Sequence, residues 1–374
     1  MGRRRLISAF AGAFSMAMMA GACGNDGSAD DQPLPAVLVE LLATPSAGGE
    51  RSIGDDHFEV WICHVPLDST AAMYGGLPLR LALTPQGVTD VVNRRVPEYF
   101  ESLSHGQYRP AFTPGGEVTI AADDLPQACV DGAIAGAGDD TEAVLVVADA
   151  EHAADQPGGF GSGGEPCPPT GQCSVATTRR VAYVGASDFH PDWGDDPPMD
   201  LVEHEIGHSL GWVHSAINDA GDYLSGLDVM SNSAAPREAE PTRRDGPGTL
   251  AINLFLAGWL PSADIVVARD EASVELAASN GEKGTRLLIL DNSGGSLYTV
   301  ELLTASGLDD HLPTGGIAVH EVHIVDGVLE PMAAMVGSPP HVALLQPDVE
   351  LQFGEWTLTA APDWTVTARK AASP

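Results

Sequence analysis

Residues 204–214 read HEIGHSLGWVH, and the rest of the fold is expected to be built around this stretch. His204 and His208 are four residues apart, so in a helix both imidazoles project from one face at a spacing that suits a single metal ion. Glu205 lies beside them and can reach a water on that ion without ligating it. We therefore predict a helix that starts near Pro198 and carries this face.

A third ligand is expected just beyond that helix. Gly211 has no Cβ atom, so the chain can turn sharply there and end the helix. The turn would bring His214 back toward His204 and His208. Three neutral imidazoles with one open position are typical of catalytic zinc, because structural zinc has four protein ligands. The sequence thus predicts one catalytic Zn²⁺ on these three histidines with Glu205 as general base. A surface helix with ordinary histidines is the alternative.

The eleven-residue stretch resembles the extended zinc motif of the metzincin metallopeptidases. Residues 228–231 (DVMS) resemble the Met-turn of that family, in which a methionine, here Met230, packs beneath the ligands. Residues 250–260 resemble the helix that follows the Met-turn in gametolysin-like and immune inhibitor A-like peptidases, and residues 298–301 and 315–320 resemble their β-rich tail. The resemblance implies an α+β fold: a metzincin-like domain with a mixed sheet plus an active-site helix, followed by a β-rich C-terminal domain.

Two features depart from the family pattern. Asn232 stands where some metzincins have a tyrosine two residues after the methionine, and the chain has no Pro-Arg-Cys-Gly cysteine switch. Control of a zymogen by a thiolate on zinc is therefore not expected. Tyr223 and His190 are the two candidates for a side chain that donates a hydrogen bond to the transition-state oxyanion.

The composition excludes other classes of protein. The chain has 52 acidic and 18 basic residues and a formal net charge of -34, so it lacks the basic stripe that nucleic acids require. Hydrophobic residues make up 44% of the chain, which is too many for a disordered polyanion. We expect a monomer whose partner is a protein or peptide substrate.

The amino terminus predicts export. Three arginines at 3–5 precede the apolar stretch 6–19 and the small residues at 20–22, which is the layout of a secretory signal. Cys23 follows directly, and this placement resembles the lipobox of bacterial lipoproteins, in which the cysteine is acylated. An ordinary secretory signal with a chance cysteine is the alternative. The expected location is the cell envelope outside the cytoplasm, with a lipid anchor as the only membrane contact, or the secreted fraction.

Four further cysteines fit an exported chain, in which an even number indicates disulfides. Cys167 and Cys173 bracket a Pro/Gly loop and form the expected local pair, which leaves Cys63 and Cys129 to close a long loop. Three connectivities are possible. A zinc cluster of these four is the other interpretation, although the chain has no CxxC spacing.

Composition and hydrophobic patterning divide the chain into four parts. We predict a signal peptide at 1–22, a lipid-anchored flexible tether at 23–55, a zinc metallopeptidase domain at 56–262 and a β-rich C-terminal domain at 263–374. Within the peptidase part we predict strands near 57–62, 144–147 and 180–185 and a helix over 88–104 with a possible kink at its proline. The strand at 180–185 is our candidate for the sheet edge that pairs with an extended peptide.

Acidic residues crowd the approach to the predicted zinc helix. Oxygen ligands in such a loop could hold Ca²⁺, and a solvated acidic loop is the alternative because EF-hand spacing is absent. The residues concerned are Asp188, Asp192, Asp195, Asp196 and Asp200.

These features together predict an exported zinc-dependent metalloendopeptidase. Water activated by zinc would hydrolyse peptide bonds with Glu205 as the general base. Two alternatives are a metzincin-fold surface binding lipoprotein without turnover and a zinc amidase that acts on cell-wall material.

Overall fold

A computed structural model describes residues 35–43, 52–68, 73–74, 76–151, 158–164, 179–217, 223–292, 296–325, 328–330, 332–334 and 344–371. Cys23, Cys167 and Cys173 lie outside these ranges, so lipidation and the second disulfide stay predictions. Within the described ranges, no helix has both the length and the apolar character needed to span a membrane.

The first sheet holds the predicted strands of the amino-terminal half. Its strand order is β4-β1-β5-β7-β6, and only β6 runs antiparallel to its neighbour. All side chains of β5 are buried, as expected of the continuous apolar run at 144–147. The strands are β1 (His57–His64), β4 (Ala111–Thr119), β5 (Ala143–Ala148), β6 (Gly159–Ser162) and β7 (Arg180–Val184).

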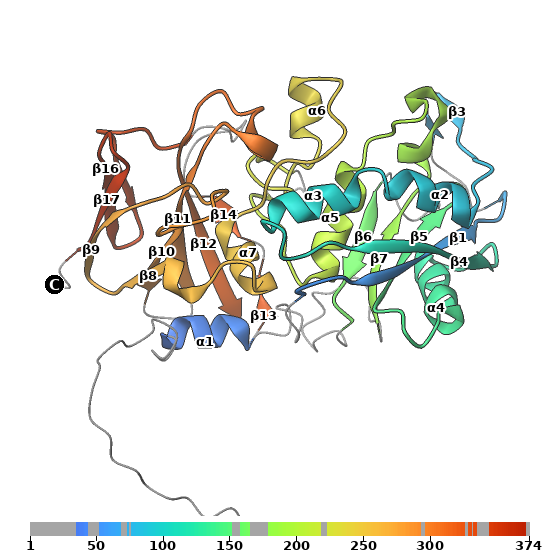
Figure 1. The fold of residues 1–374 in the computed structure, drawn as a ribbon, viewed down its shortest axis with the longest axis horizontal. Helices are drawn as coiled ribbons and strands as arrows, with labels where there is room; N and C mark the ends of the chain where they lie inside the picture. The colour runs from blue at the N-terminus through green and yellow to red at the C-terminus, as the bar shows by residue number, and fades with distance from the viewer. Residues whose placement is uncertain are drawn as a thin grey trace, which may run out of the picture. The chain divides into compact units, whose positions relative to one another are not determined.

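Helices cover both faces of this sheet (Figure 1). On one face α4 (Pro126–Gly136) packs through Val130 against Val144 and Val146. On the other face α2, α3 and α5 share a core with alternate residues of the same strands. Their bounds are α2 (Pro85–Val92), α3 (Val96–Leu103) and α5 (Asp200–Ser209). The sheet is thus the central layer that supports α5.

The predicted long-range disulfide is confirmed. Cys63 in β1 is bonded to Cys129 in α4, with their Cα atoms 5.5 Å apart. Both residues are completely buried. The bond therefore ties α4 to the face of the sheet opposite α5.

Strands dominate the chain after residue 262. A second sheet has the order β13-β12-β11-β10-β8 with β14 also paired to β12, and a third has the order β15-β16-β17-β9. A buried apolar cluster that includes Leu288, Val300 and Trp356 fills the space between them. The strands are β8 (Ile265–Ala268), β9 (Glu271–Glu275), β10 (Leu287–Asn292), β11 (Ser296–Leu303), β12 (Gly316–Val325), β13 (Val328–Leu329), β14 (Ala333–Ala334), β15 (Glu350–Phe353), β16 (Trp356–Ala360) and β17 (Thr365–Lys370).

The fold is α+β, as predicted. Residues 34–374 group into one compact unit, and the largest core cluster joins Leu254 with Ile289 across the predicted boundary at 262/263. Leu254 belongs to α7 (Ala251–Ala257), which ends at Gly258 with a left-handed φ of 88°. The division into two domains stays a prediction. Smaller elements are β2 (Met73–Tyr74), β3 (Leu77–Pro78) and α6 (Ala235–Ala239).

The segment predicted as a flexible tether at 23–55 differs from expectation in its described part. Ala36–Leu42 forms helix α1, and its Leu38 and Leu41 are buried in the main core. Farther on, the carbonyl of Ser52 accepts a hydrogen bond from Trp259 Nε1 at 2.7 Å. The seven residues of α1 (AVLVELL) are a short apolar run inside a segment rich in Gly, Asp, Ser and Pro, so the composition of the whole segment did not indicate a helix.

The helix predicted over 88–104 is two helices, α2 and α3. Thr84 caps α2, because its Oγ1 accepts a hydrogen bond from Gly87 N, and the chain leaves the helical path at Asn93. Pro97 then lies in the first turn of α3, where its missing N–H costs nothing. The proline therefore starts a helix and does not kink one.

Two buried carboxyl groups from the chain after residue 262 accept hydrogen bonds from the backbone of residues 248–251. Glu301 in β11 accepts a hydrogen bond from Ala251 N at 2.9 Å, and Asp309 accepts one from Gly248 N at 2.9 Å. Burial raises the pKa of Glu301 to about 8 and that of Asp309 to about 7. Both groups thus bind protons more tightly in the folded protein than in the unfolded chain.

This raised pKa makes stability depend on pH. The pKa of a glutamate in the unfolded chain is about 4.3. Between that pH and the folded pKa of about 8, Glu301 takes up a proton when the chain folds. The free energy of unfolding therefore falls as pH rises through this window. Glu301→Gln is expected to flatten the fall in unfolding free energy between about pH 5 and pH 8, measured by urea denaturation. The same change at exposed Glu98 serves as the control. An unaltered slope in Glu301→Gln would contradict the assignment.

Candidate metal centre

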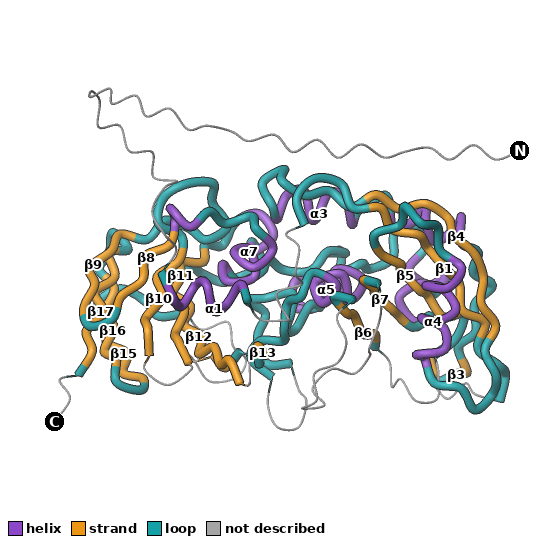
Figure 2. The backbone as a smooth tube through the Cα atoms, turned by 90° about the horizontal axis from the view of Figure 1, so that it is seen from below, coloured by secondary structure: helices purple, strands orange, loops and turns teal. Residues whose placement is uncertain are grey.

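Helix α5 carries the first two histidines of the motif. Ile206 and Val202 pack into the core, whereas His204 and His208 face away from it, with ring centroids 4.8 Å apart. Figure 2 shows α5 alongside β6 and β7 of the first sheet. The helix ends at Ser209, and the two histidines are four positions apart on it, as the sequence predicts.

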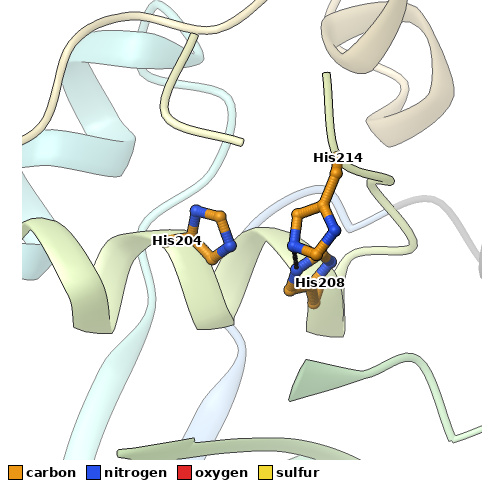
Figure 3. A group of neighbouring side chains, drawn as sticks. All are labelled: His204, His208 and His214. Atoms are coloured by element: carbon orange, nitrogen blue, oxygen red, sulfur yellow. Dashed lines mark hydrogen bonds between the residues drawn. The ribbon is translucent and has the colours of Figure 1, made fainter. Parts of the chain in front are cut away.

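The predicted turn follows directly. Gly211 has a φ of +86°, a conformation that side chains with a Cβ rarely adopt. The N–H of Trp212 returns to the carbonyl of Gly207 at 3.1 Å, which closes the end of the helix. The chain then brings His214 over His208, and their Nε2 atoms lie 2.9 Å apart (Figure 3).

The three histidines form one group. One ligand atom from each lies within 4.8 Å of the others, and no other group of three or more His, Cys, Asp or Glu residues in the described ranges meets this condition. His204 Nδ1 donates to the carbonyl of Val229 at 2.6 Å, and His208 Nδ1 donates to that of Trp212 at 2.7 Å. These bonds hold the proton on Nδ1, so Nε2 of each ring keeps a lone pair for a metal ion.

The electrostatic surroundings keep the imidazoles neutral. Burial, together with the neighbouring histidines, lowers the pKa of His204 well below its ordinary value. Burial lowers the pKa of His208 to about 4 and that of His214 to about 3. Neutral imidazole is the form that binds metals, so the donor set fits a zinc ion.

Glu205 lies beside this group on α5. It is 2% exposed, and its Oε2 has no hydrogen-bond partner among the described residues. Burial raises the pKa of this carboxyl well above its ordinary value. A buried carboxyl beside three imidazoles, with one oxygen that no described residue contacts by a hydrogen bond, is suited to hold and release a proton.

Met230 is fully buried and lies against α5 at Gly207. A Cβ at Gly207 would collide with its sulfur, so the close approach of Met230 to the helix requires glycine there. The residue before it, Val229, supplies the carbonyl that orients His204. Asp228 accepts hydrogen bonds from Met230 N at 3.1 Å and from Ser215 Oγ at 2.6 Å. Nothing in the periodicity of the sequence singled out this role of Asp228.

Of the two candidates for an oxyanion donor, Tyr223 lies at the cluster. Its Oη is 3.1 Å from His214 Nε2, and its ring centroid is 5.1 Å from that of His214. His190 Nδ1 instead accepts a hydrogen bond from Asp192 N in the loop before α5. Tyr223 therefore faces the histidine cluster directly.

The strand expected to form the free sheet edge is not at the edge. Strand β7 lies between β5 and β6, and the four-residue β6 takes the outer position. A Cβ at Gly159 would meet Glu205 Cγ at 2.8 Å, and one at Gly161 would collide with Glu205 O and His208 Cβ. Strand β6 therefore comes from a glycine-rich stretch of the sequence, and the glycines of β6 allow the strand to lie against α5.

The acidic approach to α5 does not gather into one ligand group. Asp196 pairs with Arg95 at 2.6 Å, and Asp200 pairs with Arg237 at 3.1 Å. Burial raises the pKa of Asp188 to about 7, with the charge of Asp200 as a further cause. The calcium site stays a prediction without a matching cluster of carboxylates.

Two comparisons with known proteins assign no family to this chain. No protein-family model matches this chain, and no curated protein matches it either.

The close contact between β6 and α5 can be tested by adding a single methyl group. Gly161→Ala places a Cβ against Glu205 O and His208 Cβ, so we expect a loss of about 2 kcal/mol in unfolding free energy and weaker zinc binding. Ser162→Ala in the same strand adds no atom there and is the matched control. Equal stability and equal zinc affinity of Gly161→Ala and Ser162→Ala would show that β6 does not contact the helix this closely.

Proposed function

We propose that this chain is an exported zinc metalloendopeptidase of the metzincin type. The proposal rests on one observation: three neutral imidazoles converge beside buried Glu205, whose Oε2 has no hydrogen-bond partner among the described residues. The HEIGHSLGWVH motif and its resemblance to the metzincins agree with this reading. The disulfide between Cys63 and Cys129 is consistent with export to an oxidising compartment.

His204, His208 and His214 would hold one zinc ion through their Nε2 atoms. The carbonyls of Val229 and Trp212 orient the first two rings for this task. Bound zinc supplies Lewis acidity, which lowers the pKa of water and polarises a substrate carbonyl.

Glu205 moves the proton. Its Oε2 takes a proton from the attacking water as the water oxygen bonds to the carbonyl carbon. When the C–N bond breaks, the same oxygen delivers the proton to the leaving amine nitrogen. The burial that raises the pKa of Glu205 favours this transient protonated state.

The edge strand β6 supports a peptide as the substrate. Its antiparallel pairing with β7 occupies one side of the strand, and it is the outermost strand of the sheet among the described residues. An extended peptide could pair with the other side by β-augmentation. Because Gly159 lies against Glu205, a peptide bound there passes close to the histidines.

Two alternatives predict other outcomes. A surface binding lipoprotein without turnover has no need for a carboxyl at Glu205, and here that carboxyl is present, with an oxygen that no described residue contacts by a hydrogen bond. A zinc amidase that acts on cell-wall material would use the same proton transfer, so the identity of the cleaved substrate separates it from a peptidase. The acidic composition excludes nucleic acid as the substrate.

Glu205→Gln tests the proposed mechanism. The variant keeps the size of the side chain but cannot accept a proton, so cleavage of a mixed peptide library should fall by at least about 100-fold. Zinc content should stay at one ion per chain, and the fold should be unchanged. Glu203→Gln is the matched control, because Glu203 lies on the same helix and bonds to Gly246 N, away from the histidines. Full activity in Glu205→Gln would refute the proposal.

Tyr223→Phe tests whether Tyr223 donates a hydrogen bond to the transition-state oxyanion. Removing the hydroxyl near His214 should lower kcat by about 100-fold with little change in KM, as expected for a group that binds mainly the transition state. Zinc affinity, measured by competition with a chelator, serves as the control and should change little. If kcat is unchanged, Tyr223 does not stabilise the oxyanion.

A further inference from the structure

The third histidine is held differently from the other two. His204 and His208 belong to α5, whose backbone hydrogen bonds fix both Cα positions. His214 lies beyond the left-handed turn at Gly211, outside any helix. A ligand on a segment without helical bonds needs other contacts to keep it at the metal.

One of those contacts comes from more than a hundred residues farther along the chain. The N–H of Met332 donates to the carbonyl of His214 at 2.8 Å, and Ala216 N donates to the carbonyl of Met332 at 2.7 Å. Ser215 and Met332 form a parallel bridge. The segment that carries the third histidine is therefore paired, as in a sheet, with a residue of the C-terminal part.

Met332 is itself firmly attached to the second sheet. Its side chain is 1% exposed and belongs to the main core cluster. The next two residues form β14, which pairs with His320 and Glu321 of β12. Strand β12 in turn pairs with β11 over its length.

We infer that the C-terminal sheet is a structural part of the metal centre and that the backbone of Met332 positions His214 for the ion. On the other side, Ser215 N donates to the carbonyl of Met230 at 3.1 Å. The segment thus lies between the Met230 turn and Met332, which leaves it little freedom. This inference rests on the metal site of the proposed function, and it assigns Met332 as a positioning residue, not a ligand.

The contact can be removed one atom at a time in the full-length chain. Replacing Met332 with L-leucic acid changes its N–H to an ester oxygen, and Met332→Leu provides the same side chain with the N–H intact. A second ester at Leu345 removes the hydrogen bond from Leu345 N to Ile317 O, 2.9 Å long, which also anchors the C-terminal part but does not contact His214. Zinc affinity, from chelator competition, and the number of histidine ligands, from X-ray absorption, are the readouts.

The ester at 332 should bind zinc about 10-fold to 100-fold more weakly than Met332→Leu, with fewer than three histidines on the ion. The ester at 345 should bind zinc as the wild type does. Equal affinity of the 332 ester and Met332→Leu, or an equal loss at 345, would overturn the inference. If zinc affinity depends on Met332 but no peptide is cleaved, only the proposed function fails. If peptides are cleaved but the 332 ester keeps full affinity, only this inference fails.

Discussion

Three imidazole nitrogens have to meet at one point although they come from two kinds of backbone. A helix supplies two of them at a fixed spacing, and an extended segment supplies the third after a left-handed turn at Gly211. The carbonyls of Val229 and Trp212 orient the first two rings. Much of the surrounding structure serves to keep this convergence in place, because side chains free to rotate would bind an ion weakly.

The side chains and strands around α5 pack closely enough to hold the three imidazoles together. The first sheet buries one side of the helix, Met230 lies against it at Gly207, and β6 approaches it at Gly159 and Gly161. Each close approach occurs at a glycine because a Cβ would collide there. The same packing removes Glu205 from water, and this burial raises the pKa of its carboxyl. It also leaves Glu205 Oε2 without a hydrogen-bond partner among the described residues.

The C-terminal strands are joined to this arrangement through backbone and carboxyl contacts. Met332 pairs with the His214 segment, and Glu301 and Asp309 accept N–H groups from residues 248–251. Val229 N donates in turn to the carbonyl of Gly248 at 2.9 Å. A sequence boundary near residue 262 therefore does not isolate the histidine cluster from the strands that follow it.

The local pattern of the sequence was enough to predict that the three histidines meet, the turn at Gly211, the buried strands and the Cys63–Cys129 pair. Spacing and side-chain chemistry act over short distances or through scarce residue types. The local pattern did not reveal helix α1, the edge position of β6 or the role of Met332. Those depend on which surfaces meet after folding, and backbone hydrogen bonds between distant segments leave no side-chain signature. Only the tertiary structure decided how the third histidine is held.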